Sequence, residues 1–196
     1  LLDSGADKVS INTAAVKNPE LISAAAANFG SQCIVLAIDA RKTTEGWQVY
    51  LNGGRVATDL GAVEWAKSGV DLCAVELLLT SMNADGTKDG FEIGLTRELS
   101  TKLKVPIIAS GGAGSMDDFA DAFVLGRADA ALAASVFHFG EIAIPDLKAF
   151  LAMRGIEPVW SAGRGEEDLV RRCDPQSRHR SYAGTLDLAQ MRVLLD

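Results

Sequence analysis

Short apolar segments alternate with helical segments along most of this chain, and this alternation constrains the fold more than any other feature. Residues 33–39 (CIVLAID) are almost continuously apolar, and residues 74–81 and 106–110 have a similar composition. Strands of this kind are buried on both faces, as in parallel sheets covered by helices. The alternation therefore predicts an α/β fold in which right-handed crossovers join parallel strands.

Turn residues and apolar spacing divide the chain into its expected elements. We predict five parallel strands at residues 7–12, 33–39, 74–81, 106–110 and 130–135. We predict helices at residues 18–30, 62–68, 93–103, 116–123 and 146–154, and an inserted hairpin at residues 47–58 that turns at Asn52, Gly53 and Gly54. The buried stripe of the first helix is expected to be Leu21, Ile22, Ala25 and Phe29.

Composition indicates which classes of partner and which cellular location to expect. The chain has 196 residues, 48% of them hydrophobic, and a formal charge of −7. An acidic chain without a basic stripe is not expected to bind nucleic acid, and no apolar run is long enough to cross a bilayer. The cysteines Cys33, Cys73 and Cys173 have no paired spacing, so we expect reduced thiols in a cytoplasmic protein.

The length suggests part of a larger barrel. An eight-stranded α/β barrel needs about 250 residues, and this chain begins at Leu1 within what resembles the end of a helix. We therefore expect a fragment with about five of the eight strands. Such an open segment leaves edge strands exposed and is expected to associate.

Polar residues cluster at the carboxyl ends of the predicted strands. Asn12, Asp39, Thr80 and Ser110 each fall where a strand ends. An open doubly wound sheet and a barrel both fit the alternation, but barrel enzymes build their sites at this end. The positions therefore favour a (β/α)8 TIM barrel.

Two neighbouring strands end in residues suited to a phosphate. Residues 109–114 (ASGGAG) and residues 130–137 (AALAASVF) both stop abruptly in glycine or serine. Backbone N–H groups of such loops can hold one phosphate between them.

Five motifs, in this order and at these separations, resemble the family of cyclase subunits of imidazole glycerol phosphate synthase. They are DKVSINTAAV, VLAID, LLTSMNADGTKDGF, PIIASGGAG and DAALAASVFH, and the resemblance extends to about Trp160. It implies a barrel enzyme of histidine biosynthesis that takes ammonia from a glutaminase subunit in a heterodimer. The substrate would be a bis-phosphate, the phosphoribulosyl aminoimidazole-carboxamide nucleotide, and the products imidazole glycerol phosphate and AICAR. No cofactor is implied.

The resemblance also implies roles for single residues. Asp39 matches one of two catalytic aspartates, and the other would precede this chain. The substrate phosphates would bind at Asn12 and Thr13 and at Asp85, Gly86, Gly111, Gly112, Ala134 and Ser135. Without the resemblance, Asp39 could cap the loop that follows it, and a glycine pair could be a plain turn.

The opposite end of the strands would face the partner. Lys8 and Glu76 begin their strands and match members of an ionic gate for ammonia, while Asp7 matches a contact to the glutaminase. Taken alone, the two charges would be an ordinary solvated ion pair at a barrel bottom.

The chain departs from the family at several positions and in its tail. Asn83 replaces a usual acid, Cys73 and Val75 replace usual glycines, and Arg127 is an extra residue. We divide the chain into a barrel part, residues 1–160, and a partly disordered tail of unknown structure, residues 161–196, which matches nothing in the family. In that tail, Cys173 and His179 are too few ligands for a metal site.

Two alternatives to an active cyclase stay open. The related phosphoribosyl isomerase of the same pathway shares the barrel and its phosphate loops. A chain without the first catalytic aspartate could also be an inactive phosphate-binding fragment, and we expect no turnover from the chain alone.

Overall fold

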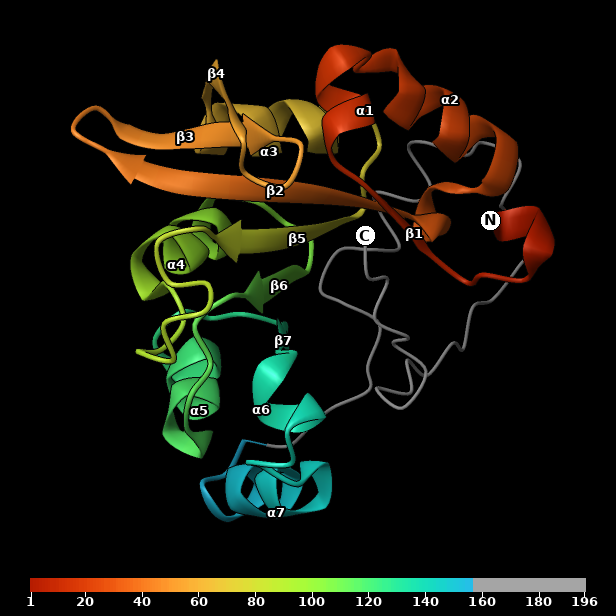
Figure 1. Cartoon of the computed structure of the whole chain (residues 1–196). Helices are drawn as coiled ribbons and strands as arrows, with labels where there is room; N and C mark the ends of the chain where they lie inside the picture. The colour runs from red at the N-terminus through yellow and green to blue at the C-terminus, as the bar shows by residue number, and fades with distance from the viewer. Residues whose placement is uncertain (157–196) are drawn as a thin grey trace.

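The computed structural model of the chain describes residues 1–156, which form one mixed sheet with helices packed on it (Figure 1). Five strands run parallel in the order β1 (Val9–Ile11), β2 (Ile34–Thr43), β5 (Glu76–Ser81), β6 (Ile107–Ser110) and β7 (Ala130–Leu132). The predicted set of five parallel strands is confirmed. The two outer strands, β1 and β7, do not pair with each other, so the sheet of the described residues is open.

The inserted hairpin is also present. Strand β2 runs four residues past Asp39 and pairs antiparallel with β3 (Gly46–Leu51), which in turn pairs with β4 (Val56–Gly61). The turn between β3 and β4 contains Asn52, Gly53 and Gly54 at φ of 54°, 62° and 81°, the left-handed backbone that such a turn needs. In Figure 1, β2 and β3 project beyond the arrowhead of β5.

The five predicted helices are found, together with shorter turns that the sequence did not predict. The helices are α1 (Thr13–Lys17), α2 (Glu20–Phe29), α3 (Ala62–Asp71), α4 (Ile93–Lys102), α5 (Met116–Val124), α6 (Ser135–His138) and α7 (Ile144–Met153), with 3-10 turns at Leu2–Ser4 and Ser31–Cys33. α1 and α6 are too short to show a periodicity. The expected strand at residues 130–135 therefore ends at Leu132, and Ser135 begins α6.

The core lies between the helices and one face of the sheet. Ile34, Leu36 and Ile38 of β2 and Leu77 of β5 are completely buried on this face. The packing is close, because a Cβ atom at Gly69 of α3 would lie 2.1 Å from Leu36 Cδ2. Since side chains alternate along a strand, the residues between these positions point to the other face of the sheet.

The prediction that Phe29 lies on the buried stripe of its helix is wrong. Phe29 is 43% exposed, whereas Ala26 is buried on the stripe of α2. Phe29 is the last residue of its helix, where the chain turns away through Gly30 at φ 91°.

The expectation of reduced thiols is wrong for Cys73, which is disulfide-bonded, whereas Cys33 is a free thiol. Spacing along the sequence excludes only local pairs, because a disulfide needs only that two Cβ atoms lie close in space. Cys73 also has φ 79°, a backbone conformation that favours glycine. Burial raises the pKa of the Cys33 thiol. The predicted tail, residues 161–196, lies outside the described residues.

The loop after β6 needs glycine at one position for two reasons. Gly112 has φ 105°, and a Cβ atom added there would lie 2.0 Å from the carbonyl oxygen of Gly90. The Gly90 N–H also donates to the Gly112 carbonyl oxygen at 2.8 Å. The loop after β5 therefore lies directly against the loop after β6, and a side chain at Gly112 would separate them.

We predict that Gly112→Ala lowers the free energy of unfolding more than Gly140→Ala does. Gly140 also has positive φ, but nothing lies within 4 Å of an added Cβ atom, so this change costs only the backbone strain, about 1–2 kcal/mol. Gly112→Ala adds the collision with Gly90. Urea unfolding of both variants makes the comparison, and equal losses would show that the two loops do not pack as described.

Candidate functional site

The candidate site lies at the carboxyl ends of the parallel strands, on the face opposite the helix-packed core. Asp39 of β2 is paired in register with Thr80 of β5, and Thr80 is paired with Ser110 of β6. Residues paired side by side in a sheet point to the same face. Three neighbouring strands therefore place a carboxylate and two hydroxyl groups in one row.

Asn12, which follows β1, joins this row through its side chain. Its Nδ2 donates a hydrogen bond to Asp39 Oδ2 at 2.9 Å. The Asn12 Oδ1 atom is buried and has no hydrogen-bond partner among the described residues. A buried acceptor without a partner is costly, so this oxygen is suited to accept an N–H or O–H group of a ligand.

The Thr13 side chain is held by a hydrogen bond from the hairpin. Its Oγ1 accepts a hydrogen bond from the backbone N–H of Asn52 at 2.9 Å. A hydroxyl group that accepts in this way keeps its own proton for another acceptor. The Asn12 side chain thus hydrogen-bonds to Asp39. The Thr13 hydroxyl can donate its proton to a ligand oxygen, such as that of a phosphate.

The other predicted phosphate residues lie on loops brought together by the strand order. Asp85 lies against Gly111, since a Cβ atom added at Gly111 would be 3.1 Å from Asp85 Cβ. The Asp85 N–H donates to the Ser81 carbonyl oxygen at 2.9 Å, which folds this loop back onto the end of β5. Gly86 and Gly111 both have positive φ, 77° and 87°.

The loop after β7 completes this group. Ser110 and Leu132 are register partners, so β6 and β7 end side by side. Gly111 and Gly112 follow the first strand. After the second strand, Ala134 is the N-cap of α6 and Ser135 is its first residue. The first N–H groups of a helix have no partner within it, and glycine lets a ligand approach the backbone closely. All six predicted residues on these three loops are thus at the carboxyl end of the sheet.

The predicted gate residues lie at the other end of the same face. Lys8 Nζ and Glu76 Oε2 form an ion pair of 2.7 Å, with 24% and 9% of the side chains exposed. Glu76 is paired with Val35, four residues before the level of Asp39 and Thr80. At 3.3 Å per residue the two levels are about 13 Å apart. Asp7 is exposed beside Lys8.

Thr80 and Ser110 join the candidate site, although the sequence marked them only as strand ends. Thr80 lies directly between Asp39 and Ser110 in register, and Ser110 is 8% exposed. A signal for them was available in the sequence. Each occupies the last or next-to-last position of an apolar strand, as Asp39 does in the predicted strand 33–39.

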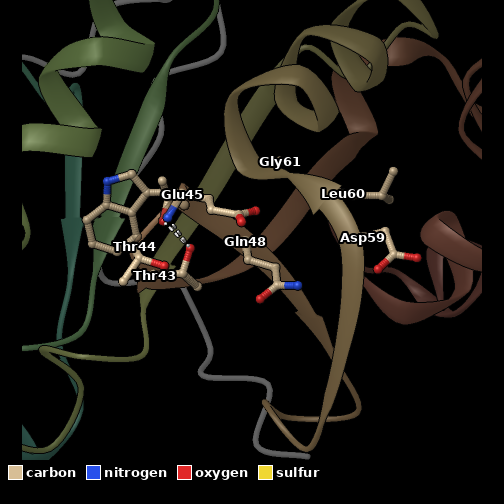
Figure 2. A pocket seen from close by; sticks show the side chains of 9 residues that line it. Thr43, Thr44, Glu45, Gln48, Asp59, Leu60 and Gly61 are labelled. Carbon is tan, nitrogen blue, oxygen red and sulfur yellow. Dashed lines mark hydrogen bonds between the residues drawn. The ribbon is translucent and has the colours of Figure 1, made fainter.

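A separate hollow of about 350 Å³ lies away from Asp39 and the glycine loops. Figure 2 shows its lining, with Glu45 and Gln48 on the β2–β3 side and Asp59 and Leu60 on β4. Its lining is mostly exposed and polar, and it contains none of the predicted site residues. We assign it no part in the site.

The described part of the chain contains neither a candidate metal cluster nor a candidate membrane span. Within residues 1–156, no group of three or more His, Cys, Asp or Glu side chains is placed to hold a metal ion. No helix in this range is both long and apolar enough to cross a membrane.

Comparison with known proteins agrees with the motifs. A family model described as histidine biosynthesis protein matches residues 1–143. Two relatives from strains of Bacteroides fragilis, both described as imidazole glycerol phosphate synthase subunit HisF, are 57% and 56% identical over 156 residues. These alignments cover 80% of this chain and 62% of each relative, so the chain spans less than two thirds of their length. The chain belongs to the histidine biosynthesis protein family.

Proposed function

We propose that this chain supplies the carboxyl-terminal five β/α units of a cyclase subunit of imidazole glycerol phosphate synthase. Five strands of an eight-stranded barrel are about the same fraction as the 62% of each relative that aligns. The observation that supports the proposal most is the single row formed by Asn12, Asp39 and Thr80, with glycine loops beside it. The face of the sheet opposite the helix-packed core would be the inside of the complete barrel.

In this proposal Asp39 moves protons during ring closure. Ammonia condenses with the ketone carbon of the bound bis-phosphate nucleotide, and water leaves to give an imine. Ring closure then breaks a C–N bond and releases AICAR, and this sequence requires that a proton be taken and returned. A positioned carboxylate can do both. The hydrogen bond from Asn12 Nδ2 holds Asp39 Oδ2 in place, while the buried Asn12 Oδ1 accepts a donor group of the substrate.

The two phosphates would anchor the substrate across the mouth. One would bind at Thr13 beside β1, and the other between the loops after β6 and β7. Two strands, β2 and β5, lie between β1 and the strands that carry these two loops. A substrate with a phosphate at each end would therefore lie across Asp39, which belongs to the strand next to β1.

The Lys8–Glu76 ion pair would control the passage of ammonia from a glutaminase subunit. It lies on the inner face, about 13 Å from the level of Asp39. A group at that distance does not reach a substrate bound at the carboxyl end. Its position suits entry from the opposite mouth of the barrel, where Asp7 would contact the partner.

We predict that Asp39→Asn nearly abolishes ammonia-dependent cyclisation. The test uses the chain fused to the amino-terminal part of the HisF subunit of Bacteroides fragilis, so that the barrel is complete. The amide keeps the shape but does not accept the proton, so kcat should fall by roughly 10²–10⁴-fold while KM stays within about threefold. Steady-state kinetics with saturating ammonium measure both, and near-normal turnover would mean that Asp39 is structural.

We predict that Lys8→Met in the same fusion lowers glutamine-dependent synthesis and spares the reaction with free ammonia. Free ammonia enters from solvent and does not need the passage. The measurement is the ratio of the two rates with the glutaminase subunit present. Lys102→Met is the matched control, because Lys102 also forms an ion pair, with Glu98 on the surface of α4. An equal loss of both rates in Lys8→Met would contradict a role in passage.

A further inference from the structure

The hairpin carries a cation and an aromatic ring onto the face that holds Asp39. Tyr50 of β3 is the register partner of Asp39, so the two side chains point to the same face of the sheet. Arg41 lies two residues after Asp39 on β2 and points to that face as well. The Arg41 guanidinium carbon lies 4.8 Å from the centre of the Tyr50 ring. The projecting hairpin thus places a cation over an aromatic ring beside the row formed by Asp39, Thr80 and Ser110.

The N–H donors of the Arg41 guanidinium are available to a ligand. Within residues 1–156 the side chain contacts the Tyr50 ring and donates no hydrogen bond, and a guanidinium carries five N–H donors. Arg41 has no carboxylate within ion-pair distance among residues 1–156, where the ion pairs belong to Lys8, Lys88, Lys102 and Arg154. The ring fixes the side chain without neutralising its charge.

Charge and geometry both indicate an anionic ligand. The chain has a formal charge of −7, so an anion approaching the mouth benefits from a local cation. The fork of a guanidinium matches two oxygens of a phosphate. Arg41 also lies on the strand next to β1, beside the end of the mouth where the Thr13 hydroxyl can donate.

We infer that Arg41, held by Tyr50, binds the phosphate group of the substrate that lies at the Thr13 side of the mouth. This inference rests on the proposed function and adds a charged residue to a subsite that otherwise has neutral donors only. Tyr50 acts as a positioning residue, because it touches Arg41 and not the phosphate.

The chain contains a matched control one residue away. Lys42 lies 5.8 Å from the centre of the Trp47 ring, and Lys42 and Trp47 are register partners. Because side chains alternate, this second cation and ring lie on the opposite face of the hairpin from Arg41 and Tyr50. Removing Lys42 changes the net charge by the same amount as removing Arg41, but on the wrong face.

The test measures binding of fructose 1,6-bisphosphate and of inorganic phosphate to the full chain by calorimetry. Arg41→Gln should weaken bisphosphate binding at least about tenfold, whereas Lys42→Gln should change it less than about threefold. Tyr50→Phe keeps the ring and should bind normally, and Tyr50→Leu should weaken binding about two- to fivefold. Circular dichroism verifies that every variant is folded.

The outcomes separate the inference from the function on which it rests. If the unchanged chain binds the bisphosphate and Arg41→Gln binds it equally well, the inference is overturned and the proposed function stands. Equal weakening by Arg41→Gln and Lys42→Gln would likewise overturn it, because the effect would then come from net charge alone. If the unchanged chain binds neither probe, the phosphate site and the inference fail together.

Discussion

The parallel register of β2 between β1 and β5 is the constraint on which the rest of this structure depends. It pairs Val35 with Glu76 at one end and Asp39 with Thr80 at the other. A shift of one residue would turn Asp39 into the helix-packed core and bring Ile38 to the opposite face of the sheet. The burial of Ile34, Leu36 and Ile38 excludes that shift, because each would lose its apolar surroundings. The core thus fixes which charged groups share a face.

The hairpin also contributes to the position of the candidate site, through contacts with the loops that follow β1 and β5. Besides the Asn52 bond to Thr13, the backbone N–H of Lys42 donates to Asn83 Oδ1 at 2.8 Å. Gly54 lies against Met82, whose terminal carbon would be 2.3 Å from an added Cβ atom. These contacts join the hairpin to the ends of β1 and β5. The hairpin therefore stabilises the loops at the carboxyl ends of β1 and β5, where the candidate site lies.

Much of this was predictable from the sequence, for physical reasons that can be named. Buried strands and amphipathic helices carry their periodicity in the sequence, so the five parallel strands and five helices were predicted, and so was the turn at Asn52. The common location of Asp39, Gly111 and Ser135 followed from the rule that parallel strands end at one edge.

What the sequence did not reveal depends on three-dimensional register or on single contacts. That Tyr50 lies opposite Asp39 follows only from the pairing of β2 with β3. The Asn12 amide was expected to bind a phosphate, but its Nδ2 donates to Asp39. Spacing along the sequence does not decide which of two polar partners a side chain contacts. α6 was missed because its four residues, Ser135–His138, are too few to show a helical periodicity.

The claim that the carboxyl end of this sheet is a phosphate-binding mouth can be tested directly by an NMR titration of the chain with inorganic phosphate. Amide resonances report each loop separately. We expect the largest shifts at the N–H groups of Gly111, Gly112 and Ser135, with Lys8 and Glu76 at the other end unchanged. Shifts that are uniform over the surface, or that are largest around Lys8, would contradict the assignment of this mouth.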